Sequence, residues 1–274
     1  MLANLPERLT KPNSDGSARV LAIANQKGGV GKTTTAVNLA TAMAACEKRV
    51  LIIDIDAQGN ASTGLGVVGA QRTITSYDLL IDQPNANDAI VHTEIPNLSL
   101  IPSSINLSGA EIELIDMDRR EFRLRDAIRS ISDSYDFVLI DCPPALGLIT
   151  LNAMCAADAV IVPLQCEFYA LEGLSHLIKT IERVKRAFNP RLDIQGVVLT
   201  MYDKRNNLSD MVAADVREHL GDKVYETVIP RNVKVSEAPS HGKPVLLYDV
   251  NCRGSQAYIH LAGEVLKRER ILAS

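Results

Sequence analysis

The chain has 274 residues, a hydrophobic fraction of 46%, an aromatic fraction of 4% and a formal net charge of −4 at pH 7. That charge excludes a global positive field around the protein, so any binding to nucleic acid would need a local patch of cations. No apolar run approaches the ~18 residues of a membrane span. The irregularly spaced cysteines favour a reducing cytosol over a disulfide framework or a zinc site; they are Cys46, Cys142, Cys155, Cys166 and Cys252.

Residues 1–17 form a polar stretch rich in Pro, Asn, Ser and Gly and are expected to be a mobile tail. Short β-branched runs then predict strands at 19–25, 49–56, 98–103, 136–141, 158–164, 194–200 and, more weakly, 224–230. Periodic stretches between them predict helices at 32–45, 119–131, 170–187 and 207–220. This alternation predicts an α/β fold with a doubly wound, mostly parallel β-sheet flanked by helices, and ligands bound beyond the carboxyl ends of the strands.

A glycine-rich stretch, GGVGKTT, follows the first predicted strand and opens the first predicted helix, which is the setting of a phosphate-binding loop. Glycines allow backbone conformations that a Cβ forbids, so consecutive N–H groups can converge on phosphate oxygens at a helix N-terminus. The residues predicted to hold a nucleotide here are Lys27, Gly28, Gly29, Val30, Gly31, Lys32, Thr33 and Thr34. The alternative, a glycine-rich turn without a ligand, is disfavoured because lysine, hydroxyl and strand context agree.

Three side chains of this loop have predicted roles. Lys32 reaches the β- and γ-phosphates, the Thr33 hydroxyl ligates Mg²⁺, and Thr34 donates to the α-phosphate. The strict pattern G-x-x-x-x-G-K-[ST] nevertheless fails, because Gln26 stands where its first glycine belongs. Beside it lies a second cation, Lys27, in a loop that already has its phosphate lysine.

Two later strands are predicted to end in carboxylates. Asp141 ends the run FVLID, where a carboxylate matches the Mg²⁺-supporting acid of nucleotide hydrolases. Asp54 and Asp56 come at the end of another strand, in DIDAQGN, and Asp56 is expected in the loop that follows. A carboxylate there can orient the attacking water or hold Mg²⁺ through water. The alternative that one of the two only caps a turn stays open, above all for Asp54.

The motifs KGGVGKTT, DIDAQGN and DCPP, in this order and spacing, resemble the deviant Walker A ATPases of the ParA/Soj partition family. The resemblance continues through PLQCEFYALEGL (163–174), TMYDKRNNLS (200–209) and IPRNVKVSEAPSHGKPV (229–245). It implies a P-loop NTPase fold of the deviant Walker A type and a single ATPase domain at 18–274. One departure is Ala57, which replaces the proline of the family's D-x-D-P-Q-G-N and leaves that loop more backbone states.

The resemblance implies a cytoplasmic, nucleoid-associated ATPase that uses ATP and Mg²⁺ and forms an ATP-dependent homodimer with two nucleotides sandwiched between the subunits. It also explains the second lysine, since Lys27 would cross to the partner's phosphates and offset their charge. The implied catalytic residues are Lys27, Lys32 and Asp56, and the implied metal-binding residues are Thr33, Asp56 and Asp141. Pro230 and Asn232 match the loop that contacts adenine in the family.

Members of this family bind double-stranded DNA non-specifically as ATP dimers, and a ParB-type centromere-binding protein accelerates hydrolysis and release. The candidate DNA-binding cations are Lys204, Arg205, Arg231, Lys234, Lys243 and Arg253. The resemblance favours Arg205 and Lys234 most. No aromatic residues are interleaved with these cations, so we expect contact with phosphates and no reading of bases. Taken singly, each cation is also compatible with a solvated surface charge.

Two alternatives share the phosphate loop. A MinD-like division-site ATPase would need a basic amphipathic C-terminal helix for the membrane surface. The spacing of Tyr258, Leu261, Ala262, Val265 and Leu266 instead predicts a helix face docked on the protein core, so no membrane partner is expected. An electron-transfer ATPase of the nitrogenase iron-protein type would need cysteines at defined places, and the isolated cysteines of this chain disfavour it.

Overall fold

The computed structural model describes residues 16–273, with side chains as far as Arg270. Residues 1–15 of the expected tail therefore lie outside the described residues. The strands are β1 (Arg19–Ile23), β2 (Val50–Asp54), β3 (Val91–His92), β4 (Leu98–Ile101), β5 (Phe137–Asp141), β6 (Ala159–Gln165), β7 (Asp193–Tyr202) and β8 (Val224–Pro230). The helices are α1 (Lys32–Ala45), α2 (Asn60–Gly64), α3 (Ser76–Ile81), α4 (Leu107–Leu114), α5 (Arg123–Arg129), α6 (Leu148–Ala156), α7 (Ala170–Ala187), α8 (Asn207–Leu220), α9 (Val233–Glu237), α10 (Val245–Tyr248) and α11 (Arg253–Ala273).

In the described part of the chain the strands form one eight-stranded sheet in the order β3-β4-β2-β5-β1-β6-β7-β8. Neighbouring strands are parallel, apart from the antiparallel pair β3–β4 at one edge. From β1 the sheet continues on one side through β6, β7 and β8 and on the other side through β5, β2, β4 and β3, so the chain builds outward to both sides of β1, which is the doubly wound arrangement. The predicted fold class is therefore confirmed.

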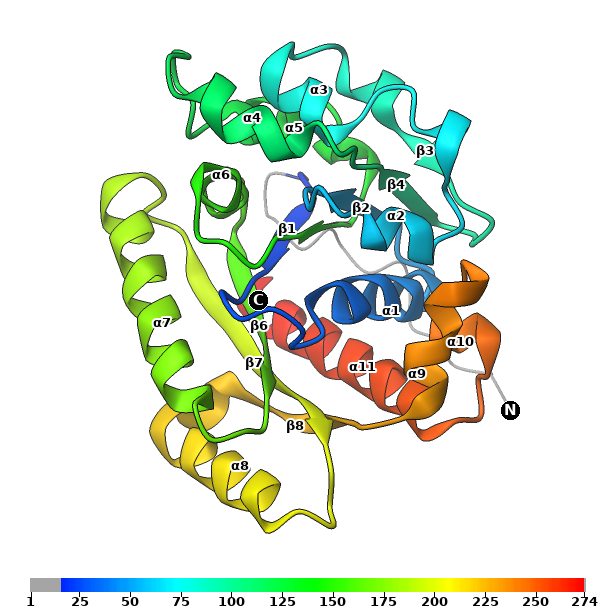
Figure 1. The fold of residues 1–274 in the computed structure, drawn as a ribbon, viewed down its shortest axis with the longest axis vertical. Coiled ribbons are helices and arrows are strands. Elements are labelled where there is room, and N and C mark those ends of the chain that lie inside the picture. Colours follow the sequence, from blue (N-terminus) through cyan, green and yellow to red (C-terminus); the bar gives the residue numbers. More distant parts are fainter. Residues whose placement is uncertain (1–15, 274) are drawn as a thin grey trace.

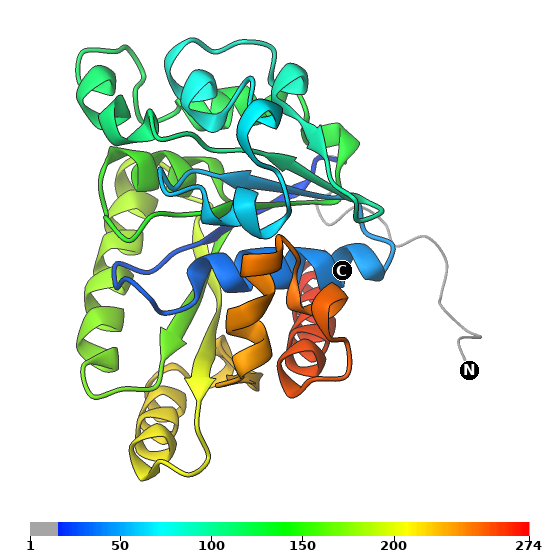
Figure 2. The same cartoon turned by 45° about the vertical axis from the view of Figure 1, so that its right-hand side comes forward.

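Helices cover both faces of the sheet (Figure 1). Alternate side chains of β1 enter opposite layers, because successive residues of a strand point to opposite faces. Val20 and Ala22 pack with the layer of α3 to α8, whereas Leu21 and Ile23 pack with α1 and α11. Figures 1 and 2 both show the red helix α11 beside the blue helix α1. This double burial explains why the strand sequences are almost continuously apolar.

Most predicted elements match the structure. Helices α1, α7 and α8 have the predicted bounds, and every predicted strand is present, although β3 was not predicted. The helix predicted at 119–131 is wrong at its start, because α5 begins only at Arg123. Arg119 adopts a positive φ of 52°, and its carbonyl accepts a hydrogen bond from the Phe122 N–H, so this stretch is a turn.

The C-terminal helix α11 docks on the core along the predicted face. Tyr258, Leu261, Ala262, Val265 and Leu266 are all buried, and they pack in the same layer as α1. Within residues 16–273, no helix combines the length and apolar character that crossing a membrane requires.

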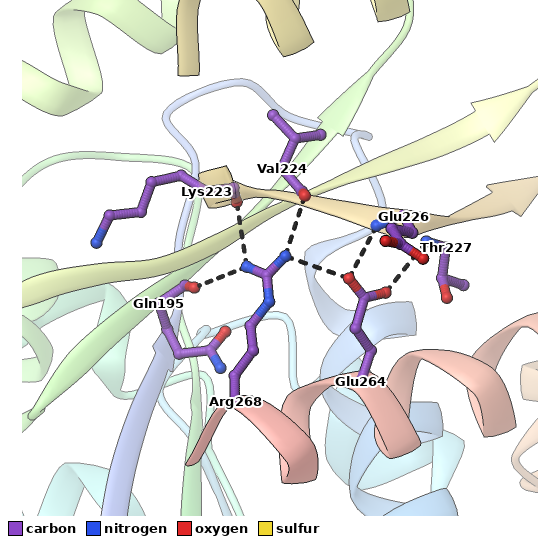
Figure 3. A network of polar contacts seen from close by, with 7 residues as sticks. All are labelled: Gln195, Lys223, Val224, Glu226, Thr227, Glu264 and Arg268. Atoms are coloured by element: carbon purple, nitrogen blue, oxygen red, sulfur yellow. Dashed lines mark hydrogen bonds and ion pairs between the residues drawn. The ribbon is translucent and has the colours of Figure 1, made fainter. Parts of the chain in front are cut away.

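Polar contacts also fasten α11 to the edge strand β8, as Figure 3 shows. The Glu264 carboxylate accepts hydrogen bonds from the backbone N–H groups of Glu226, at 2.8 Å, and Thr227, at 3.1 Å. These residues lie where the register between β7 and β8 shifts. Glu264 therefore satisfies amides at an irregular part of the sheet edge, where unpaired groups invite association with other chains.

Arg268 completes this attachment one helical turn later. Its guanidinium donates to the carbonyls of Gln195, at 3.2 Å, and Val224, at 3.0 Å, and it lies 4.2 Å from the centre of the Tyr225 ring. It also donates to Glu264, at 3.2 Å. One side chain thus ties α11 to both β7 and β8.

We expect Arg268→Ala to lower the free energy of unfolding by about 1–3 kcal/mol, because it removes charge-assisted hydrogen bonds from partly buried carbonyls and a cation–π contact. Urea denaturation of the two proteins measures the difference. Lys267→Ala, at an exposed position on the same helix, is the matched control and should change the value by less than about 0.5 kcal/mol. Equal losses in both variants would contradict a specific role for Arg268.

Candidate functional site

The sheet brings the predicted phosphate loop and the predicted acids to one edge. Asp141 at the end of β5 pairs in register with Ile23 at the end of β1 and with Asp54 at the end of β2. Because these strands are parallel, the segments that follow β1, β2 and β5 leave the sheet side by side. Residues from three distant parts of the sequence therefore meet beyond the carboxyl ends of the central strands.

The loop between β1 and α1 has the backbone that its glycines suggested. Gly29 and Gly31 have positive φ angles of 75° and 88°, in the left-handed region that other residues avoid. A Cβ placed on Gly28 or Gly29 would meet no atom within 4 Å, so the outer side of the loop is open. From β7, the Thr200 hydroxyl donates to the Val30 carbonyl at 2.8 Å and holds the loop in place. This is a shape that phosphate groups can approach at the start of α1.

Lys32 lies at the base of this loop. Its side chain is buried, and its ammonium group donates to the Lys27 carbonyl at 3.0 Å. Burial lowers the pKa of Lys32, and the negative charge of Asp141 acts in the opposite direction. Thr33 and Thr34 follow in the first turn of α1 and are partly buried. The Lys32 ammonium is thus already positioned in the loop, where it donates to one carbonyl and can donate to further acceptors.

Asp141 is fully buried, and neither of its carboxylate oxygens accepts a hydrogen bond within the described residues. Burial raises the pKa of Asp141 well above its ordinary value, and the neighbouring Asp54 carboxylate raises it further. The Thr33 hydroxyl and the Lys32 ammonium lie near enough to act in the opposite direction. Mg²⁺ prefers oxygen ligands, so a carboxylate that accepts no hydrogen bond and lies near a hydroxyl suits this ion.

Asp54 is also fully buried, but its oxygens have partners. They accept hydrogen bonds from the Ser62 N–H at 2.9 Å, the Ser62 hydroxyl at 2.7 Å and the Asp56 N–H at 3.2 Å. The carboxylate therefore ties α2 and the preceding loop to the end of β2. This geometry matches the interpretation of Asp54 as the residue that caps a turn.

Asp56 lies in the loop after β2, where it was expected, and is partly exposed. Its carboxylate accepts a hydrogen bond from the Gln58 N–H at 3.0 Å. Its negative charge partly offsets the lowering of the Lys32 pKa by burial and adds to the rise of the Asp141 pKa that burial causes, so it lies near both groups. Ala57 beside it packs partly against the core.

Lys27 forms an ion pair with Glu167, in the segment between β6 and α7. Two neighbours also reach this region: the Asn25 amide donates to the Pro163 carbonyl at 2.8 Å, and the Gln26 amide donates to the Gly173 carbonyl at 3.1 Å. Glu167 was not predicted as a site residue. The motif PLQCEFYALEGL contained it, but no local pattern shows that this motif reaches the phosphate loop.

Next to Glu167, two aromatic side chains point into solvent. Phe168 is 76% exposed and Tyr169 is 67% exposed, and their rings contact each other edge to face. The Lys27–Glu167 pair thus adjoins an apolar surface on the same side as the phosphate loop.

A cavity of about 790 Å³ lies beyond the ends of β7 and β8, near the start of α11. Four of the six predicted DNA-binding cations line it, together with the predicted adenine-contacting residue Pro230; these cations are Lys204, Arg205, Arg231 and Arg253. Asn232 lies just outside the lining, and its side chain accepts a hydrogen bond from the Lys234 N–H at 2.8 Å, at the start of α9. Lys234 and Lys243 also lie outside the lining of this cavity, on the segment that leads to α10.

All six cations are exposed. The two that the resemblance favours most are paired with carboxylates: Arg205 with Asp203 at 2.9 Å and Lys234 with Glu237 at 3.0 Å. The other four form no ion pair within the described residues.

Comparison with known proteins places the chain in a family. A family model described as "AAA domain" matches residues 18–194. The chain is 66% identical to the chromosome partitioning protein ParA of Caulobacter vibrioides, over 92% of this chain and 95% of that protein. It is 53% identical to the sporulation initiation inhibitor protein Soj of Bacillus subtilis, over 90% of this chain and 98% of that protein.

Solved structures with the same fold agree with this placement. Cobyrinic acid a,c-diamide synthase from Mycobacterium smegmatis, with bound ADP and magnesium, is 36% identical with a TM-score of 0.80, over 91% of this chain and 94% of that one. The cell division ATPase MinD of Pyrococcus furiosus is 30% identical with a TM-score of 0.76, over 91% and 99%. Each of these relatives and structures matches 90% or more of this chain. The chain belongs to the ParA/Soj family of chromosome-partitioning ATPases.

Proposed function

We propose that this protein binds ATP and Mg²⁺, dimerises around two nucleotides, holds double-stranded DNA non-specifically, and leaves DNA after hydrolysis that a ParB-type partner stimulates. Repeated cycles would segregate a chromosome or a plasmid and place the protein on the nucleoid. One observation carries the proposal: an open glycine loop with a buried lysine lies beside a buried carboxylate that accepts no hydrogen bond from the part of the chain that the structure describes. Relatives over nearly the whole length support it. We assign the function to one domain, residues 18–274.

Each residue of the site has a task in this proposal. The loop amides from Lys27 to Gly31, together with Lys32 and Thr34, bind the phosphates. Thr33 and Asp141 hold Mg²⁺, which when bound offsets the negative charge of the phosphates, and Asp56 supports it through water. Asp56 also orients the attacking water. Pro230 and Asn232 contact the adenine.

The task of Lys27 lies in the dimer. Two ATP molecules facing each other accumulate negative charge, and a cation supplied by each subunit to its partner's phosphates offsets it. In the structure Lys27 is paired with Glu167 of its own chain, so it must leave that carboxylate before it can cross. The side chains are 46% and 31% exposed, and ion pairs at this exposure are weak, so little free energy is needed to break this one.

Lys27→Ala should weaken ATP-dependent dimerisation by more than about tenfold, because the partner's phosphates lose a charged contact. ATP binding by the monomer should stay within about threefold of wild type, since Lys32 and the loop amides remain. Light scattering with ATP measures the dimer, and titration with a fluorescent ATP analogue measures binding. Lys32→Ala is the contrasting variant and should lose nucleotide binding itself. A Lys27→Ala protein that dimerises normally would refute the crossing role.

Asp56→Ala should bind ATP and dimerise but hydrolyse ATP at least about 10²-fold more slowly, because the water is no longer oriented. The dimer should consequently remain on DNA. Phosphate release measures turnover, and the time course of dissociation from immobilised duplex measures retention. Gln58→Ala, at an exposed position in the same loop, is the matched control. Normal turnover in Asp56→Ala would move this role to another residue.

DNA retention should need ATP and fall steeply with salt, by about 0.9 in log affinity per log unit of salt for each phosphate contacted. Arg205→Glu and Lys234→Glu should each weaken retention by more than about tenfold at 0.1 M salt, because the dimer presents two copies of every cation. Retention of two unrelated duplexes, with ATP or ADP and with or without a ParB-type protein, measures this.

Lys185→Glu is the control for these reversals, because Lys185 is exposed near the opposite, amino end of β7. It should retain DNA as wild type does. A marked preference for one duplex, or normal retention by both Arg205→Glu and Lys234→Glu, would count against phosphate binding by these cations.

A further inference from the structure

A carboxylate lies among the cations of the cavity beyond β7. Asp203 immediately follows β7 and lines this cavity with Lys204, Arg205, Arg231 and Arg253. The Asp203 carboxylate accepts two side-chain hydrogen bonds from Arg205, from Nε at 3.0 Å and from Nη2 at 2.9 Å. Both oxygens are engaged, one by each nitrogen, which is the fork geometry in which arginine also binds a phosphate.

We propose that Asp203 competes with DNA phosphates for the Arg205 guanidinium and thereby sets how tightly the dimer holds DNA. The inference rests on the proposed function, because it assigns a further residue to the DNA site. While Arg205 binds Asp203, it adds no net charge to the cavity. When a phosphate takes its place, the Asp203 carboxylate is left beside a second anion, which opposes binding.

The exposure and charge of the Arg205–Asp203 pair support a competitor that a phosphate can displace. The Arg205 side chain is 88% exposed and that of Asp203 is 27% exposed, and ion pairs of this kind are individually weak. The hydrogen bonds from Arg205 lower the pKa of Asp203 to about 2, so its negative charge is present at neutral pH. The cavity therefore has four cations and a permanent opposing charge. Such a site allows contact with phosphates and also favours release.

The alternative is that Asp203 only shapes the turn, because its carboxylate also accepts a hydrogen bond from the Arg205 N–H at 3.0 Å. Asp203→Asn separates the two roles. An asparagine keeps the side-chain oxygen that accepts from the backbone, but it removes the charge and one acceptor of the fork. The Lys234–Glu237 pair offers a less direct test, since Glu237 also accepts a hydrogen bond from the Tyr248 hydroxyl.

The experiment measures affinity for a random-sequence duplex over a range of salt, using the full chain with Mg²⁺ and a non-hydrolysable ATP analogue. Asp203→Asn should bind on the order of eightfold tighter per protomer at 0.1 M salt, and the salt slope should steepen by about 0.9 per protomer, because one more phosphate contact counts. ATP binding and dimerisation should be unchanged.

Two controls make the result specific. Asp193→Asn removes the same charge from another ion pair, that of Asp193 with Lys223 at 2.7 Å. Asp193 begins β7, at the end away from the cavity, so this variant should leave DNA affinity unchanged. In an Arg205→Gln background, the gain from Asp203→Asn should fall to less than about a third, because there is no guanidinium left to release.

Each other outcome overturns the inference in a recognisable way. If the wild-type dimer binds the duplex and Asp203→Asn binds equally well, Asp203 has no competing role, while the proposed function stands. If the full gain persists without Arg205, Asp203 acts only as a repulsive charge. If the wild-type dimer holds no duplex at all, the proposed DNA binding and this inference both fail.

Discussion

The site depends on the buried carboxylate of Asp141. It ends a central strand, neither of its oxygens accepts a hydrogen bond from any residue that the structure describes, and it is the register partner of a second buried acid, Asp54. A buried charge without a partner is strongly unfavourable, so this edge of the sheet is stabilised by any cation that reaches it. The two acids differ in their contacts: Asp54 accepts hydrogen bonds from Ser62 and from the loop backbone, whereas Asp141 accepts none within the described residues. The parallel register of three strands therefore brings the two acids together beside the loop that follows β1.

The phosphate loop is also joined to the segment between β6 and α7. Lys27 reaches it through the ion pair with Glu167, while Asn25 contacts Pro163 in β6 and Gln26 contacts Gly173 in α7. A change at the phosphates that moves Lys27 would therefore release Glu167 beside the exposed rings of Phe168 and Tyr169.

The charge of the protein is organised locally. The whole chain has a net charge of −4, yet four exposed cations line one cavity beyond β7 and β8. The helix that contributes Arg253 to this cavity is the same helix that Glu264 and Arg268 fasten to the sheet edge. Buried side chains and these polar contacts hold α11 against the sheet, and its first residue lies at the cavity with the loops that follow β7 and β8.

The sequence by itself determined the strands, most helices, the phosphate loop and the acids that end two strands, because these depend on short-range patterns and on local backbone needs such as the positive φ of Gly31. It also predicted the buried face of α11, which is a periodic signal. Only the tertiary structure decided which of the two acids is hydrogen-bonded, since that depends on Ser62 and on strand register. It alone paired Lys27 with Glu167 and Arg268 with β7 and β8, because such contacts join residues far apart in the chain and leave no periodic trace.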